Sequence, residues 1–377
     1  MTGDAIETRE FKRIMNGQRP SLRLISGVGK KGPACFAIEA GGKRLVLDLG
    51  EGPPPGLMPD IASAAPADAL ILSHGHKDHI GGLSLLAQLG HPPIYATEIV
   101  AESLPGGLAV RPLPVHGVSE VLGIPVETGR DGHAPGGIWL HFGIGDGFLY
   151  TGDYSAESTL YAYDPPTRPA HTALIDCSYG DYAKSLADSW SEFATHLGKG
   201  PLLLPVPANG RGPEIALELM RHGIRDIYID EAMQKALRQL GEGAGISLRE
   251  GLTAEILRLA AVARAIDGAR GVMLAASADG ASGATARLFP EFERSPQIEI
   301  LFTGYINPNT PAERLSKSGR ARRMRWNVHP RLSDTVALVR GVQAQTVIPA
   351  FCDRAQLAAL GGALAPACVT MDAVVEI

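Results

Sequence analysis

Short apolar runs separated by glycine and polar turns dominate the first half of the chain. Runs of this length and spacing are typical of β-strands. The segment Leu45-Val46-Leu47-Asp48 has the apolar character of a buried strand and ends in a carboxylate. A longer apolar stretch over about 80–89 predicts a helix. The predicted strands are 22–26, 34–40, 44–48, 68–73, 110–115, 124–128, 137–142 and 147–151.

The pattern changes after about residue 183, where segments with helical periodicity begin to alternate with short apolar runs. This alternation indicates βα units and a parallel sheet. The second region therefore looks like an insertion into the first. The predicted helices are 185–198, 212–222, 231–240 and 252–266, and the predicted strands are 201–206, 226–229, 271–276 and 298–302.

The composition is that of an ordinary globular protein and does not indicate an overall basic, membrane-spanning or disulfide-rich protein. The chain has 377 residues, of which 45% are hydrophobic and 20% charged, and its formal net charge is −5. This charge does not indicate a protein that is basic overall, as many nucleic-acid binders are. No apolar run is long enough to span a membrane. The four cysteines are far apart and form no CxxC pair, so we expect a cytoplasmic protein without disulfides.

A six-residue loop after the strand at 68–73 carries the clearest chemical signal. It reads His74-Gly75-His76-Lys77-Asp78-His79. Imidazoles suit zinc and similar metals, and a carboxylate can add charge or bridge two ions. A lone histidine would more often be structural, but this cluster predicts a site for two divalent metals, of the kind that supports hydrolysis.

Other strand ends offer further candidate ligands. His133 lies in a glycine-rich loop, and Asp153 follows the strand at 147–151. Taken alone, either residue could equally be a turn residue. Asp48 also ends a strand, and we expect it to orient a ligand histidine or its loop. The GxGxxG string at 27–32 is followed by a strand, not a helix, so it predicts a β-hairpin and not a dinucleotide site.

In this order, Asp48, the histidine loop, His133 and Asp153 resemble the metallo-β-lactamase superfamily. The second half is similar to its β-CASP branch, which includes ribonuclease J and the cleavage-and-polyadenylation endonuclease. The motifs that carry this second resemblance are Asp176-Cys177-Ser178-Tyr179-Gly180, the Gly-Arg stretch at 205–214, the strand ends at 276–283 and 301–305, and Val328-His329-Pro330 with Asp334.

The resemblance implies an α/β fold, namely a metallo-β-lactamase αββα sandwich with an inserted α/β β-CASP cap. The implied domains are residues 1–182, the cap at 183–325, and a return to the first domain at 326–377. The implied ligands of the first metal are His74, His76 and His133. Asp78 and His79 would hold the second metal, with Asp153 bridging the two. The metals would be zinc, with manganese as the alternative.

The same resemblance assigns roles around the metals. Asp176 would support the site, and His329 would lie near the scissile phosphate and protonate the leaving oxygen. Asp78 or Asp153 would accept a proton from the attacking water. Arg211 and backbone N–H groups at the glycine-rich turns around Gly283 and Gly304 would bind substrate.

One departure from the family concerns the second metal. The family usually places a last histidine in a stretch that here reads Val347-Ile348-Pro349-Ala350-Phe351-Cys352-Asp353. The second metal therefore lacks a ligand unless Cys352 or Asp353 replaces it. An ordinary buried thiol is the favoured reading of Cys352, so the second site is expected to be weak or empty.

These features predict a metal-dependent phosphodiester hydrolase, most simply a nuclease acting on single-stranded RNA or DNA. One alternative is a hydrolase of a small ester, thioester or phosphodiester, and another is a weakened member that binds nucleic acid or a protein partner. A homodimer is also compatible with the sequence. A basic run leads into His329 and either tracks a nucleic-acid backbone or forms a solvated face. It consists of Arg314, Lys317, Arg320, Arg322, Arg323 and Arg325.

Overall fold

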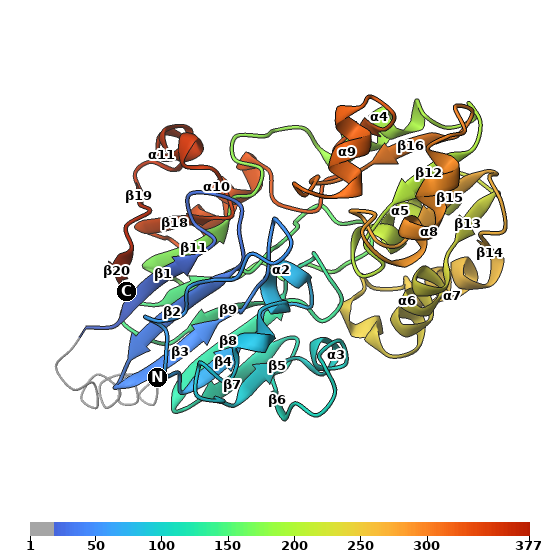
Figure 1. The fold of residues 1–377 in the computed structure, drawn as a ribbon. Helices are drawn as coiled ribbons and strands as arrows, with labels where there is room; N and C mark the ends of the chain where they lie inside the picture. The colour runs from blue at the N-terminus through green and yellow to red at the C-terminus, as the bar shows by residue number, and fades with distance from the viewer. Residues whose placement is uncertain (1–18) are drawn as a thin grey trace.

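The computed structural model describes residues 19–377 and contains three β-sheets (Figure 1). Residues 1–18 of the predicted first domain lie outside the described residues. The first sheet begins with the predicted glycine-rich hairpin, whose two strands pair in antiparallel register. Its strand order is β20 (Val374–Glu376), β1 (Ser21–Ser26), β2 (Cys35–Ala40), β3 (Lys43–Leu47), β4 (Ala69–Ile71), β5 (Ile94–Ala96) and β6 (Val110–Pro112).

The second sheet combines the middle of the chain with its C-terminal part. Strand β18 from the C-terminal part lies beside β11 in parallel register, so the chain re-enters this sheet after the cap. The strand order is β19 (Cys368–Val369), β18 (Thr346–Ala350), β11 (Thr172–Asp176), β10 (Phe148–Tyr150), β9 (Ile138–Phe142), β8 (Ile124–Arg130) and β7 (Gly117–Val121).

The two sheets pack face to face around a shared core, and each has a second core on its outer face. Leu45 and Leu47 point into the core between the sheets, whereas Val46 between them points into an outer core. In the second sheet, Leu174 faces the shared core and Ile175 faces the opposite outer core. This two-residue period is what a buried strand requires. Short helices α2 (Lys77–Ile80) and α3 (Glu98–Ala101) belong to the first sheet's side, and α10 (Leu332–Gly341) and α11 (Leu357–Leu364) cover the second.

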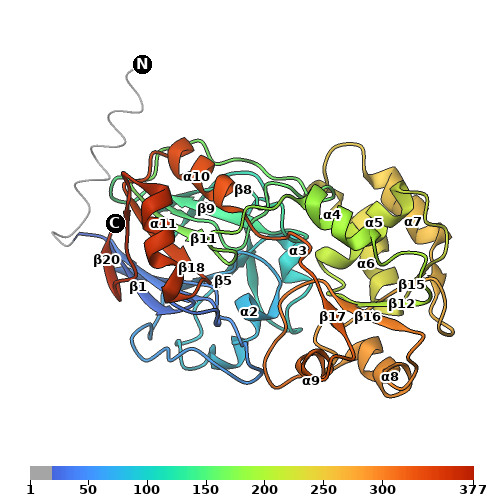
Figure 2. The same cartoon turned by 90° about the horizontal axis from the view of Figure 1, so that it is seen from above.

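The cap contains a third sheet with helices on both faces, beside the sandwich (Figure 2). Leu203 faces one apolar core, and its neighbours Leu202 and Leu204 face the other. All of its strand pairs are parallel, as the alternation of elements predicted. The strand order is β14 (Arg264–Ala265), β13 (Ile227–Ile229), β15 (Val272–Ala275), β12 (Leu202–Pro205), β16 (Glu299–Phe302) and β17 (Arg322–Arg323).

The helices of the cap divide between the two faces of this sheet. One face is covered by α4 (Leu186–Ala194), α5 (Arg211–Arg221), α6 (Glu231–Glu242) and α7 (Thr253–Val262). The other is covered by α8 (Gly283–Phe292) and α9 (Pro311–Lys317). Within residues 19–377, no helix combines the length and apolar character that a membrane span needs. The short 3₁₀ turns are η1 (Leu83–Leu85), η2 (Ala244–Ser247) and η3 (Arg354–Gln356).

The predicted helix over 80–89 is wrong. Helix α2 ends at Ile80, and only η1 and turns follow it. The reason is a close approach of two loops: a Cβ on Gly82 would lie 2.6 Å from the carbonyl oxygen of Gly50. The apolar residues of this stretch pack under the first sheet without helical backbone. The pattern also missed β5, β7, β11, β14 and the strands from β17 to β20, and the predicted helix at 252–266 stops at Val262.

Candidate metal centre

The histidine loop lies directly after a central strand of the first sheet. Strand β4 ends at Ile71, a short loop that bends at Gly75 and His76 follows, and α2 then begins at Lys77. The loop points His74 and His76 toward one space, while the first turn of α2 supplies Asp78 and His79. Strand ends and the loops that follow them are where parallel sheets place binding groups.

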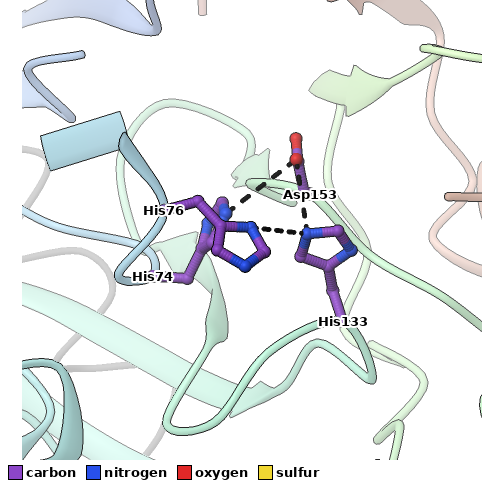
Figure 3. A group of neighbouring side chains, drawn as sticks. All are labelled: His74, His76, His133 and Asp153. Atoms are coloured by element: carbon purple, nitrogen blue, oxygen red, sulfur yellow. Dashed lines mark hydrogen bonds and ion pairs between the residues drawn. The ribbon is translucent and has the colours of Figure 1, made fainter. Parts of the chain in front are cut away.

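Two other loops bring His133 and Asp153 to the same point (Figure 3). His133 Nε2 lies 3.0 Å from His76 Nδ1 and 3.6 Å from Asp153 Oδ2. His74 Nε2 lies 3.9 Å from the same carboxylate oxygen. One ligand atom from each of these four residues lies within 4.8 Å of the other three. The residues come from loops after β4, β8 and β10, so only the fold brings them together.

These four residues fit a metal ion. Zinc binds imidazole nitrogen and carboxylate oxygen at about 2.0–2.2 Å, so two ligand atoms of one ion lie roughly 3–4 Å apart. The distances between the four side chains have this size. His74 Nε2 is also buried and has no hydrogen-bond partner within residues 19–377. A buried nitrogen of this kind is costly unless something binds it, and a cation in the shared space would do so.

The protonation states favour the same conclusion. Burial lowers the pKa of His74 well below its usual value, and nearby imidazoles act in the same direction. Burial also lowers the pKa of His133, against the opposing charge of Asp153. Burial alone would raise the pKa of Asp153, but the imidazoles of His79 and His329 hold it well below its usual value. Neutral imidazoles and an ionised carboxylate are the forms that bind metals.

A second group shares Asp153 with the first. It consists of Asp78, His79 and Asp153, and the His79 Nε2 atom lies 3.3 Å from Asp153 Oδ1. The other ring nitrogen of His79 donates to Asp48 Oδ2 at 2.7 Å. Asp48 also accepts hydrogen bonds from the backbone N–H and hydroxyl of Ser73, both at 2.7 Å. This buried carboxylate therefore contacts both His79 and the start of the histidine loop, and its predicted role in orienting them stays a prediction.

An aromatic ring from the stretch at 347–353, where the family usually has a last histidine, lies beside His79. The ring centroid of Phe351 lies 5.2 Å from that of His79, in an edge-on arrangement. Cys352 is buried, and burial raises the pKa of its thiol to about 12, so it stays protonated. Asp353 accepts a hydrogen bond from the Ala355 N–H and thereby caps η3. None of these three residues belongs to a cluster of potential metal ligands within residues 19–377.

His329 lies on the cap side of the same cluster. Its Nδ1 atom lies 2.8 Å from Asp176 Oδ2 and 3.7 Å from Asp153 Oδ2. Asp176 is fully buried at the end of β11, and its other oxygen accepts the Ser178 N–H at 2.9 Å. The Asp176 carboxylate thus sets the orientation of the His329 ring beside Asp153.

A cleft of about 680 Å³ opens between the first domain and the cap at this cluster. Arg211 and Gly304 line it, whereas Gly283 does not, although Ala278 and Asp279 from the preceding turn do. The guanidinium of Arg211 packs against Gly304, and within residues 19–377 its buried Nε atom has no hydrogen-bond partner. Arg211 is therefore an unpaired cation facing the cleft.

The basic run divides into two parts. Arg323 and Arg325 line the cleft, and the Arg325 guanidinium lies 4.3 Å and 4.2 Å from the ring centroids of Tyr179 and Tyr182. The other four residues have local partners away from the lining. Arg314 pairs with Glu293, Lys317 with Glu313 and Arg322 with Glu299, while Arg320 donates to backbone carbonyls of 292–298.

The hairpin loop at 27–32 supplies two lysines that the sequence did not indicate for this site. Lys30 and Lys31 line the cleft, and the Lys31 Nζ atom lies 5.0 Å from the ring centroid of Tyr305 on the cap. Sequence reasoning also missed Asp131, whose buried carboxylate accepts the backbone N–H of His133 at 2.7 Å. The only sequence signal for Asp131 was its position two residues before a candidate ligand.

Known proteins resemble this chain in two ways. Residues 28–191 match the model of the metallo-beta-lactamase superfamily. A ribonuclease from Thermus thermophilus is 30% identical over 247 residues, which are 53% of this chain and 56% of that protein. Transcription termination factor FttA from Cenarchaeum symbiosum is 28% identical over 246 residues, 52% of this chain and 38% of that factor. An RNase J-like protein from Methanocaldococcus jannaschii is 25% identical, over 55% of this chain and 57% of that protein.

The chain thus spans about two fifths to three fifths of the length of these relatives. A crystal structure of a protein of unknown function from Enterococcus faecalis V583 resembles the whole fold. Its TM-score is 0.62, its sequence identity 13%, and the match covers 96% of this chain and 100% of that one. This second likeness concerns the fold alone.

Proposed function

We propose that this chain, which carries a metallo-β-lactamase superfamily domain, is a metal-dependent nuclease that processes RNA. The superfamily and the α/β fold are those that the sequence predicted. The observation that carries the proposal is the cluster of His74, His76, His133 and Asp153, of which the last three line a cleft together with several cations that form no salt bridge within residues 19–377. Further support comes from the relatives named as a ribonuclease and an RNase J-like protein.

The proposed ligands of a first divalent metal are His74, His76 and His133, with Asp153 shared between two positions. When bound, zinc or manganese would supply Lewis acidity and make water an effective nucleophile near neutral pH. Asp78 and His79 would hold a second metal only weakly, because Phe351 occupies the place of the expected further ligand.

The chain's own residues would handle the protons. Asp78 or Asp153 would accept the proton of the attacking water, since both carboxylates belong to the same cluster. His329 would protonate the departing oxygen, because Asp176 holds its Nδ1 atom and leaves the rest of the ring at the cleft. General acid catalysis of this type is worth roughly 10²–10⁴-fold in rate.

A polyanionic substrate suits the lining of the cleft. Five of the cationic side chains that line the cleft form no ion pair with a carboxylate in the described part of the chain. They are Lys30, Lys31, Arg211, Arg323 and Arg325. Three tyrosines lie beside them at Tyr179, Tyr182 and Tyr305. Cations interleaved with aromatic rings bind the backbone and bases of single strands. We propose that Arg211 and Gly304 contact the phosphate nearest the metals, and that Gly283 acts only indirectly.

The proposal is tested by cleavage of 5′-phosphorylated single-stranded RNA and DNA by purified protein. Zinc and manganese are supplied in separate reactions, and Asp153→Ala protein prepared in the same way controls for contaminating nucleases. We expect RNA cleavage that disappears in the variant. Equal cleavage by both proteins would assign the activity to a contaminant and contradict the proposal.

A second candidate function is favoured by the incomplete second position. A hydrolase of a small ester, thioester or phosphodiester needs fewer substrate contacts and could act with one metal. Turnover of small substrates, together with intact RNA in the same preparations, would support this candidate. We also propose a cytoplasmic location, since the four cysteines are free thiols, and a homodimer remains a prediction from the sequence.

A further inference from the structure

Two ligand histidines are held by backbone carbonyls from outside the first part of the metallo-β-lactamase domain. His76 Nε2 lies 2.8 Å from the carbonyl oxygen of Asn209, which belongs to the loop between β12 and α5 of the cap. His133 Nδ1 lies 2.6 Å from the carbonyl oxygen of Val328, on the segment that returns from the cap. A carbonyl oxygen only accepts hydrogen bonds, so each of these ring nitrogens carries the proton.

These two hydrogen bonds fix which nitrogens remain free. In each neutral ring the other nitrogen then carries a lone pair. The free atoms are His76 Nδ1 and His133 Nε2, and they face each other at 3.0 Å. Two lone pairs at this distance repel each other unless a cation or proton lies beside them. The carbonyls therefore prepare a pair of metal-binding nitrogens.

The loop that carries Asn209 fits closely against the histidines. Gly210 has a φ of 111°, a backbone conformation that residues other than glycine rarely adopt. A Cβ on Gly210 would lie 3.3 Å from His76 Nε2 and 3.5 Å from the His133 carbonyl oxygen. The hydroxyl of Tyr161, which belongs to the first domain, donates to the Gly210 carbonyl oxygen at 3.0 Å. This loop is thus positioned by direct contact with the metallo-β-lactamase domain.

One buried carboxylate ties the two carbonyl-bearing segments together. Glu214, in the first turn of α5, accepts hydrogen bonds from the Ser158 hydroxyl and the Thr159 N–H, both at 2.7 Å. Its second oxygen accepts the indole N–H of Trp326 at 3.0 Å. Glu214 follows Asn209 by five residues, and Trp326 precedes Val328 by two residues. The carboxylate therefore links the first domain, the cap and the return segment.

We infer that the first metal site is assembled by the docked cap, and that Glu214 is the positioning residue that holds it. The inference rests on the proposed metal site. Asn209 and Val328 orient His76 and His133 through their carbonyls, and Glu214 keeps both carbonyls in place. Coupling of this kind is reciprocal: metal bound to the histidines stabilises the docked cap, and a loosened cap weakens the metal.

The test is the zinc affinity of Glu214→Gln protein, measured by competition with a chromophoric chelator. The amide can still accept from Ser158 and Thr159, but its NH₂ group opposes the indole N–H of Trp326. We expect zinc to bind roughly 10–100-fold more weakly, the range found when outer groups that orient metal ligands are changed. Glu218→Gln is the matched control, because Glu218 lies one turn further along α5 and, within residues 19–377, its carboxylate pairs only with Arg221 and His222. Its zinc affinity should equal that of the wild type.

Thermal unfolding with and without zinc separates positioning from a loss of general stability. If the inference holds, zinc raises the unfolding temperature of Glu214→Gln protein less than that of the wild type. A lower unfolding temperature with unchanged zinc affinity would overturn the inference and make Glu214 a structural residue only. Tyr161→Phe, which releases the Gly210 carbonyl without touching Glu214, provides the same comparison if Glu214→Gln protein does not fold. Wild-type protein that binds no zinc would overturn the metal site, and this inference with it.

Discussion

The two halves of the metal centre share Asp153 but differ in completeness. The first half has three histidines around the carboxylate, and burial keeps at least two of them neutral. The second half has only Asp78 and His79 besides Asp153. There, burial acts to lower the pKa of His79, but the carboxylates of Asp153 and Asp48 raise it well above its usual value.

This difference has a local cause. The first half is built from three loops of the metallo-β-lactamase domain and supported by two carbonyls near the cap. The resemblance leads us to expect one more ligand of the second half in the loop after β18, but the ring of Phe351 from that loop lies edge-on to His79. The first half thus offers more potential ligand atoms than the second, and we expect it to hold a divalent metal more firmly. The following predictions test this asymmetry.

The largest effect is expected from Asp153→Ala, because Asp153 is the one residue common to both halves. Removing its carboxylate leaves the buried imidazoles without their counter-charge and removes a ligand from both positions. We expect hydrolysis to fall by at least about 10³-fold, with the fold retained by circular dichroism. Activity close to that of the wild type would mean that the cluster does not carry the reaction.

A comparison of His74→Ala with His79→Ala separates the halves. His74→Ala should abolish tight zinc binding, because it removes a fully buried ligand of the complete half. His79→Ala should leave about one tightly bound zinc per chain, since the first three histidines remain. Elemental analysis after dialysis measures both. Equal loss of zinc in the two variants would contradict the asymmetry.

Phe351→His should strengthen the second half by supplying an imidazole next to His79. Phe351 has a φ of 61°, which histidine adopts more readily than bulky residues do. We expect bound metal to rise from about one toward two per chain when zinc or manganese is in excess. Phe351→Leu controls for loss of the aromatic ring. Unchanged stoichiometry would show that more than one missing side chain weakens this half.

The smallest effect is expected at the rim of the cleft. Lys30→Ala and Lys31→Ala should each weaken binding of single-stranded RNA by roughly two- to tenfold, because each removes one backbone contact. The slope of log affinity against log salt should fall by about 0.7 for each lysine. Arg314→Ala, whose side chain pairs with Glu293 away from the cleft lining, should change neither quantity.

The sequence by itself determined the fold class and the chemistry. Short apolar runs in the first half predicted most strands of the first sheet and β8 to β10 of the second, and the alternation of helices and strands after residue 183 predicted the parallel sheet of the cap. The histidine loop is local in sequence, so its ligand types could be read without a structure. The one wrong helix, over 80–89, failed because a contact between Gly82 and Gly50 overrides the local apolar pattern.

Only the tertiary structure decided which of these residues meet. His133, Asp153 and Asp176 end different strands, and no local pattern states that their side chains share one space. The basic run illustrates the same limit, since its charges look alike in sequence but four of the six have local partners. Hydrogen bonds accepted by backbone carbonyls, such as those of Asn209 and Val328, do not depend on the side chains of the accepting residues. Their effect on His76 and His133 depends on how far each carbonyl oxygen lies from the ring nitrogen and on the direction in which it points. Only the folded chain sets both.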